Sequence, residues 1–283
     1  MDGRVWLVPG TVPGDLARAR MSRDHGRWVA GSLVQIVSAS PERRTPPCPI
    51  QPVCGGCPFM PVGEQAQREA KRRFVVDALE RIGKLRDVEV EACVPSPVPL
   101  GYRNKIELTF GTIEGRPIVG YHAADDPARL VEVEVCPIGD ARLTPALHVV
   151  RAGLGDGSLS PRPGRLVLRA SGAGRGVLVG FRDAGEPFPE AAGIARALEA
   201  HVPDLQGVVR LIATPGRRGG TRVETLSGHP WIDDVLLGRA YRVPAGTFLQ
   251  VNAAAADVLA RHVVDGAGHV ASVLELYGGV GAI

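Results

Sequence analysis

No apolar run in this 283-residue sequence approaches the ~20 residues needed to cross a bilayer. The N-terminus also lacks a charged-then-apolar export signal, so we expect a cytoplasmic protein with no membrane association. Internal repeats and low-complexity tracts are absent, although 36 glycines and 24 prolines are spread along the chain. With 45% hydrophobic and 22% charged residues, the composition is that of a globular protein with room for two or three domains.

The charge balance is nearly neutral, and a net charge of +3 is too small to require a nucleic-acid partner. Its distribution is less even, because residues 1–73 contain eleven Arg or Lys against six Asp or Glu, an excess of five. A basic end on a near-neutral chain indicates either a polyanionic partner or a solvated basic surface.

Cysteine is scarce, yet three of the five cysteines lie in one ten-residue stretch, CPIQPVCGGC. Cys48, Cys54 and Cys57 are joined by a remote fourth thiol, Cys136, in the phrase VEVCPIGD. Four thiolates suit a [4Fe–4S] cluster or a structural zinc, and the absence of a second CxxC knuckle favours the cluster. The other interpretation, chance disulfides or scattered core cysteines, fits poorly with a reducing compartment. Cys93 lies in an apolar segment and is interpreted as a small buried hydrophobe.

Alternating and β-branched residues predict short strands of a small β-barrel within residues 4–47. A helix that packs against a core is predicted over residues 64–85, ended by Gly83, with one apolar face formed by Phe74, Val75, Ala78, Leu79 and Ile82. Antiparallel strands are predicted in VEVEACV, KIELTF, RPIVGYH and RLVEVEVC. A helix over about residues 140–152 and a βαβ-like alternation then predict a mixed α+β middle.

Two further stretches carry side chains suited to ligands. GYRNKIELTF places Tyr102, Arg103, Asn104 and Lys105 at a strand entrance. Two cations beside a ring can grip a phosphate and stack a base, or they can be ordinary surface charge. Near the C-terminus, PAGTFLQVN precedes a helical run, and the predicted strand VASVLELY leads into GGVG. A glycine-rich loop at the end of a first parallel strand is where α/β folds admit a nucleotide.

Together, SPERRTPPC, CPIQPVCGGC, VCPIG, YRNK, TFLQVN and LELYGGVG resemble, in order and spacing, the bacterial RNA 5-methyluridine methyltransferase family. The resemblance covers nearly the whole chain and implies an S-adenosylmethionine-dependent transfer of a methyl group to uracil C5. It implies three domains: a partial TRAM/OB-like β-barrel (1–47), an iron–sulfur loop with a central α+β RNA-binding domain (48–243), and the start of a Rossmann-type methyltransferase domain (244–283). The expected fold class is therefore multidomain, α+β and α/β.

The same resemblance assigns site residues. It implies a [4Fe–4S] cluster on Cys48, Cys54, Cys57 and Cys136, and S-adenosylmethionine contacts at Gln250, Tyr277, Gly278 and Gly281. It adds Phe248, which lies where the family places a ring near the target base. The other expected RNA contacts follow from the basic N-terminal region and the YRNK stretch: Arg43, Arg44, Tyr102, Arg103 and Lys105. Ala282 stands where many members carry an asparagine, so that cofactor contact is not expected here.

In this family the nucleophilic cysteine and the general base follow the glycine-rich loop, so the chain is expected to be an enzyme fragment cut at both ends. No residue of the chain is assigned a catalytic role, and we expect a monomer. The favoured substrate is a uridine in rRNA, with tRNA as the second choice, and the sequence does not decide between them. Two alternatives remain: a non-catalytic RNA-binding module with a structural metal or cluster, and a zinc-stabilised adaptor.

Overall fold

The computed structural model describes residues 3–172, 174–214, 216 and 219–276. By its internal contacts the chain divides into two compact units, Met1–Pro95 and Ser96–Ile283. This division is coarser than the three expected domains, whose boundaries stay a prediction. None of the helices in the described part of the chain has the length and apolar character of a membrane span.

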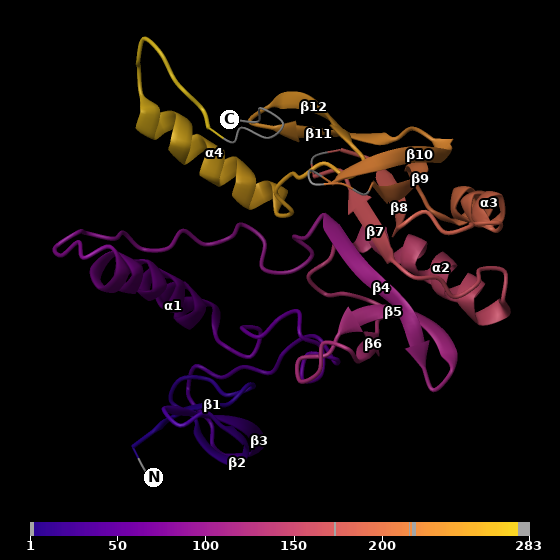
Figure 1. The fold of residues 1–283 in the computed structure, drawn as a ribbon. Helices are drawn as coiled ribbons and strands as arrows, with labels where there is room; N and C mark the ends of the chain where they lie inside the picture. Colours follow the sequence, from indigo (N-terminus) through magenta and orange to yellow (C-terminus); the bar gives the residue numbers. More distant parts are fainter. Residues whose placement is uncertain (1–2, 173, 215, 217–218, 277–283) are drawn as a thin grey trace. The chain divides into compact units, whose positions relative to one another are not determined.

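The first unit holds a three-stranded sheet and one long helical segment (Figure 1). Its elements are β1 (Val5–Leu7), β2 (Leu16–Asp24), β3 (Trp28–Ser38), α1 (Glu64–Asp77) and the π-helical turn η1 (Ala78–Ile82). The strand order is β1-β3-β2, with β1 parallel and β2 antiparallel to β3. The strands and the helix predicted from the sequence are therefore confirmed, while closure of the sheet into a TRAM-like barrel stays a prediction.

Two predictions for this unit are wrong. The apolar face of α1 was expected to pack in a core, but no residue of α1 is buried, and Phe74 is 59% exposed. Its ring meets only the edge of Phe59, at 6.3 Å between centroids, among the ring contacts of the described residues. The stretch VEVEACV forms no strand, because no described strand lies beside it; the Val90 carbonyl accepts a side-chain hydrogen bond from Arg72 instead.

The second unit is built on a seven-stranded sheet of order β10-β9-β8-β7-β4-β5-β6. Its elements in chain order are β4 (Lys105–Ile113), β5 (Arg116–His122), β6 (Leu130–Glu132), η2 (Ala141–Leu143), α2 (Thr144–Asp156), β7 (Arg165–Ala170), β8 (Val177–Asp183), α3 (Ala191–His201), β9 (Leu205–Thr214), β10 (Gly220–Gly228), β11 (Trp231–Leu236), β12 (Arg239–Pro244) and α4 (Ala253–Ala267). All neighbouring strands are antiparallel except β8 and β9, which are parallel and connected through α3. The predicted mixed α+β middle is confirmed.

The sheet has two differently covered faces. Helices α2 and α3 contact each other and cover one face of the sheet through β5, β9 and β10 (Figure 1). The hairpin β11–β12, which has a sheet of its own, packs Ile232 and Val243 onto Val167, Val209 and Leu211. Since alternate strand residues face opposite sides, these three valine and leucine positions define the face away from the helices.

The C-terminal stretch departs from expectation. VASVLELY was predicted as the first strand of a parallel sheet, but its described part, through residue 276, forms no strand. Val273 and Leu274 are 74% and 84% exposed, and no described strand lies beside them to accept their backbone hydrogen bonds. A parallel strand is stable only when neighbours pair with it and cover both faces, so the apolar pattern alone does not form one.

Candidate functional site

Three sequence motifs that lie far apart in the chain meet at the start of β4 in the second unit. Arg103 forms isolated β-bridges on both sides, parallel to Gly139 and antiparallel to Asn252. The motif YRNK is therefore flanked by the VCPIG turn on one side and by the TFLQVN segment on the other. Residues whose numbers differ by more than a hundred are brought together by backbone hydrogen bonds.

The first flank is the turn that follows Cys136. Its carbonyl oxygen accepts from the Gly139 amide at 2.9 Å, which closes the turn. Arg103 N–H then donates to the Ile138 carbonyl at 2.8 Å, and the Asp140 amide donates to the Arg103 carbonyl at 3.0 Å. Cys136 is half-buried. Because the turn that it begins is hydrogen-bonded to Arg103, this predicted cluster ligand lies close to predicted RNA contacts of the second unit.

The second flank is the segment 247–252, which connects β12 to α4. The Asn104 amide donates to the Val251 carbonyl at 2.8 Å. Asn252 caps α4, since its Oδ1 accepts from the Ala255 amide at 3.0 Å and its Nδ2 donates to Ser96 Oγ at 3.0 Å. A segment held at both ends projects its middle outward: Phe248 is 72% exposed, and Gln250 is exposed as well.

Two charged side chains at the start of β4, Arg103 and Lys105, already interact with other groups of the second unit. Arg103 is exposed, with its Nε donating to the Lys105 carbonyl at 3.1 Å, whereas Lys105 Nζ pairs with Glu107 at 2.7 Å. Burial raises the pKa of Glu107, but Lys105, with Arg182 and Arg165 nearby, lowers it below the ordinary value on balance. Glu107 is therefore an ionised partner that orients Lys105, and Arg103 is the more available cation for a phosphate.

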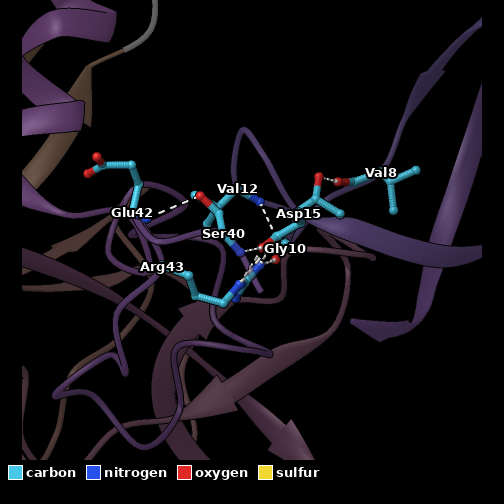
Figure 2. Close-up of polar contacts among 8 residues, drawn as sticks. Val8, Gly10, Val12, Asp15, Ser40, Glu42 and Arg43 are labelled. Atoms are coloured by element: carbon cyan, nitrogen blue, oxygen red, sulfur yellow. Dashed lines mark hydrogen bonds and ion pairs between the residues drawn. The ribbon is translucent and has the colours of Figure 1, made fainter. Parts of the chain in front are cut away.

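The remaining predicted RNA contacts lie in the first unit, where Asp15 and Arg43 form a buried ion pair (Figure 2). The side chain of Asp15 is 1% exposed and accepts from the Val12 and Ser40 amides at 2.7 and 2.9 Å. The hydrogen bond and charge of Arg43, together with those amides, hold the pKa of Asp15 well below its usual range against the opposing effect of burial. Arg43 also donates to the Gly10 carbonyl at 2.7 Å, so it ties the loop between β1 and β2 to the loop that follows β3.

Arg44 is also engaged within the first unit. Its Nε donates to the Met60 carbonyl at 2.9 Å, and its guanidinium pairs with Glu64 at 3.1 Å. Arg43 and Arg44 thus both form hydrogen bonds and ion pairs within the first unit, and their contact with RNA stays a prediction.

The cysteine loop is folded by its own backbone hydrogen bonds. The Gln51 amide donates to the Cys48 carbonyl at 3.2 Å, the Cys54 amide to the Ile50 carbonyl at 2.8 Å, and the Met60 amide to the Cys57 carbonyl at 3.1 Å. All five cysteines of the chain are half-buried. No three histidine, cysteine or acidic side chains of the described ranges are grouped closely enough to hold a metal ion. The described residues therefore do not show the expected four-thiolate ligand set, and the cluster stays a prediction; its expected fourth ligand, Cys136, belongs to the other unit.

Sequence reasoning missed Arg169 and Asp234, and it placed Asn104 at a strand entrance without giving it a role. Asn104, Arg169 and Asp234 are 2%, 4% and 3% exposed, and the first two hydrogen-bond to the backbone of segment 247–252. One signal was present in the sequence: the strand RLVLRA is apolar except for its arginines, and a buried arginine usually has a hydrogen-bonding or charged partner. Three of the predicted cofactor contacts, Tyr277, Gly278 and Gly281, lie outside the described residues.

Comparison with known proteins adds to this geometry. No protein-family profile matches the chain. A protein of Gloeobacter violaceus named as an uncharacterized RNA methyltransferase is 35% identical over an alignment of 300 positions, which covers 100% of this chain and 64% of that protein. Proteins of the same description from Thermosynechococcus vestitus and Halalkalibacterium halodurans are 30% and 27% identical, with 99% and 100% of this chain and 64% of each relative aligned.

Among solved structures, the tRNA (uracil-54, C5)-methyltransferase of Pyrococcus abyssi, in complex with S-adenosyl-L-homocysteine, is similar in fold. The TM-score is 0.72 at 24% sequence identity, covering 98% of this chain and 64% of that one. The chain thus spans just under two thirds of the length of the proteins it matches, and it shares the fold of the corresponding part of the archaeal protein.

Proposed function

We propose that this chain is part of an S-adenosylmethionine-dependent RNA methyltransferase that modifies uracil at C5. The observation that carries the proposal is the convergence of the VCPIG turn, the start of β4 and segment 247–252 on one place in the second unit. The names of the similar proteins support the class of enzyme. We expect the protein to be a cytoplasmic monomer that acts on rRNA or, as the second choice, on tRNA.

The RNA contacts follow from exposure and charge. Arg103 is exposed at the start of β4 and can pair with a phosphate, while the exposed ring of Phe248 can stack on an unpaired base. Tyr102 and Lys105 flank Arg103 and extend the same contact. Single-stranded or flipped bases are the natural partners of such a combination, because a base inside a duplex offers no free face to a ring.

The cofactor contacts are proposed from position along the chain. Gln250 is exposed on the segment that carries Phe248, so one segment can present a polar group to S-adenosylmethionine and a ring to the base. Tyr277, Gly278 and Gly281 complete the proposed cofactor contacts. S-adenosylmethionine supplies the methyl group; no residue of this chain is assigned as the nucleophile that activates uracil or as the base that removes the C5 proton.

The first unit is proposed to contribute a TRAM-like domain and part of a [4Fe–4S] site. Cys48, Cys54 and Cys57 would supply three thiolates and Cys136 the fourth, with a structural role. Anaerobically purified protein should then contain iron and sulfide, and Cys136→Ser should remove both. Cys93→Ser is the matched control and should leave the iron content unchanged; one stoichiometric zinc and no iron would exclude the cluster.

Methylation is tested most cleanly in the cell. Deleting the gene and quantifying nucleosides from purified rRNA and tRNA by mass spectrometry should remove 5-methyluridine from one of the two pools. The pool that loses it identifies the substrate class. Undiminished 5-methyluridine in both pools would overturn the proposed activity.

A non-catalytic RNA-binding module is the second candidate. It is favoured because the contacts proposed for Arg103 and Phe248 require RNA but no cofactor and no catalytic residue. It predicts unchanged 5-methyluridine together with RNA binding by the purified chain. That binding should weaken steeply with salt, since each phosphate contact releases counterions. Arg103→Gln should weaken binding and flatten the salt dependence, whereas Arg242→Gln, an exposed arginine on β12, should change neither.

A further inference from the structure

The second unit contains a group of buried polar atoms that its own residues leave without hydrogen-bond partners. Among the described residues, seven buried side-chain nitrogen or oxygen atoms have no partner, and five of them belong to Asn104, Arg169 and Asp234. They are both amide atoms of Asn104, Nε and Nη2 of Arg169, and Oδ2 of Asp234. Such groups are costly to bury, so a native fold that gathers three of these residues requires an explanation.

Two of the three residues, Arg169 and Asn104, hydrogen-bond to the segment that carries Phe248 and Gln250. Arg169 Nη1 donates to the Thr247 carbonyl at 3.1 Å, at the beginning of the segment. The backbone amide of Asn104 donates to the Val251 carbonyl at 2.8 Å, at its end. The segment is thus fixed at both ends by the residues whose side chains are left unsatisfied.

Asp234 closes the group from the hairpin β11–β12. Its Oδ1 accepts from the Gly172 amide at 3.0 Å and from the Val235 amide at 2.9 Å. A Cβ atom placed on Gly172 would lie 3.1 Å from Asp234 Oδ1, 3.3 Å from Asn104 Nδ2 and 2.4 Å from the Cβ of Ala253. Gly172 therefore lets the polar group and the start of α4 approach one another closely.

The charges of the group are matched but not in direct contact. No ion pair joins Arg169 to Asp234 in the described part of the chain, although burial lowers the pKa of Arg169 and the charge of Asp234 opposes that shift. The unpartnered atoms include both donors and acceptors, so the three side chains are polar in both senses. Because these atoms have essentially no solvent exposure, they cannot touch a large ligand themselves.

We propose that Asn104, Arg169 and Asp234 are positioning residues: a buried polar brace that fixes segment 247–252 and thereby presents Phe248 and Gln250. Directional hydrogen bonds specify a backbone path, which an apolar support would leave free to shift. Only the ligands named for Phe248 and Gln250 rest on the proposed function. The brace itself is a statement about this chain and is testable on it.

The test is backbone hydrogen exchange of the purified 283-residue chain, followed by mass spectrometry of peptides covering residues 244–256. Arg169→Met removes the donor to the Thr247 carbonyl and should speed exchange in those peptides by about tenfold, as expected for losing one buried hydrogen bond. Arg169→Lys keeps one donor and should recover most of the protection. Arg182→Met is the matched control, because Arg182 pairs with Glu107 at 3.9 Å and should leave residues 244–256 unchanged.

Asp234→Asn preserves the shape of the group and removes its charge, so it serves if Arg169→Met fails to fold. It should also speed exchange in residues 244–256 while leaving strands β7 and β8 protected. Exchange that rises uniformly over the sheet, or not at all, in both variants would overturn the brace. RNA affinity measured on the same variants separates the two proposals: faster exchange with unchanged affinity leaves the brace standing and contradicts the role given to Phe248.

Discussion

Arg210 and Arg169 are both buried in the seven-stranded sheet of the second unit, on opposite faces and in opposite states of hydrogen bonding. Arg210, on the helix-covered face, pairs with Asp183 through Nε at 2.8 Å and Nη2 at 2.9 Å. Arg169, on the face covered by the hairpin, makes one hydrogen bond to the Thr247 carbonyl and leaves Nε and Nη2 unpartnered. One sheet thus contains a completed charge pair and an incomplete one.

The surroundings of the completed pair explain its role. Asp183 has a side chain with 0% exposure and also accepts from Arg162 at 2.6 Å and from the Gly185 amide at 2.9 Å. Burial raises the pKa of Asp183, but these donors outweigh it and lower the pKa below its usual value. Arg162 in turn lies over the ring of Phe188, at 3.6 Å from its centroid. Each of these groups supports the fold, whereas those around Arg169 support one exposed segment.

The largest expected effect comes from breaking the completed pair. Arg210→Met leaves the Asp183 carboxylate buried with one cation fewer and should lower the free energy of unfolding by about 3–5 kcal/mol. Urea denaturation followed by circular dichroism measures it. Arg242→Met, which removes an exposed arginine 3.6 Å from Asp233, should change it by less than about 0.5 kcal/mol. Equal effects of the two variants would refute the distinction.

The ion pair of the first unit extends the comparison to another fold. Asp15→Asn removes the charge that Arg43 neutralises and should cost about 1–3 kcal/mol, measured by the same denaturation. Asp24→Asn, in the exposed pair with Arg4, is the control and should cost less than about 1 kcal/mol. If Asp24→Asn costs as much as Asp15→Asn, burial is not what makes the pair strong.

The same carboxylate predicts a pH dependence. The folded-state pKa of Asp15 is lowered, so its stabilising contribution is fully present above the unfolded-state pKa of about 3.9. It is lost as the pH falls below that value towards the folded-state pKa. Unfolding free energies between pH 6 and pH 3 should therefore fall more steeply in the wild-type chain than in Asp15→Asn; parallel curves would contradict the assignment.

A smaller effect on stability is expected from the incomplete group. Arg169→Met loses one hydrogen bond but also removes two unsatisfied buried donors, so the free energy of unfolding should change by less than about 1 kcal/mol. The contrast with Arg210→Met, measured under identical conditions, is the sharpest form of the comparison. A loss as large as that of Arg210→Met would show that Arg169 carries the fold rather than a site.

The smallest effect on stability is expected at Phe248. Its ring is 72% exposed, so Phe248→Ala should leave the free energy of unfolding within about 0.5 kcal/mol of the wild type. RNA affinity should nevertheless fall by about fivefold or more, because base–aromatic stacking contributes about 1–3 kcal/mol per base. Leu259→Ala, at an exposed position of α4, is the matched control for affinity. Unchanged affinity in Phe248→Ala would remove this residue from the proposed RNA contact.

Local patterns were sufficient to predict most elements of the second unit. The alternation of KIELTF identifies β4, and the helical spacing of apolar residues after Cys136 identifies α2. Both patterns reflect burial on one side of the element. The same reasoning failed for VEVEACV and for the described part of VASVLELY, because a strand depends on a neighbour that its own sequence does not specify. The hairpin β11–β12 was not predicted, because its two-residue turn is Leu237-Gly238, with φ of 50° and 75°, and a leucine is not the residue that usually marks such a turn.

The candidate site was predictable only in pieces. The motifs containing Arg103 and Phe248 were identified, but their meeting depends on the β-bridge between Arg103 and Asn252. The buried group around Arg169 was not identified, because the purpose of a charged residue in an apolar strand depends on what the rest of the fold places against it. Asp234 lies 65 positions later in the sequence, in the hairpin that covers that strand.

The central claim is that the start of β4 and segment 247–252 form one RNA-facing site. Ultraviolet cross-linking of the chain to RNA containing 4-thiouridine, followed by mass spectrometry of the attached peptides, tests it directly. The account predicts cross-links concentrated in residues 96–105 and 244–252, and fewer at Phe248 in Arg169→Met. Cross-links confined to other parts of the chain, with none in these two stretches, would contradict it.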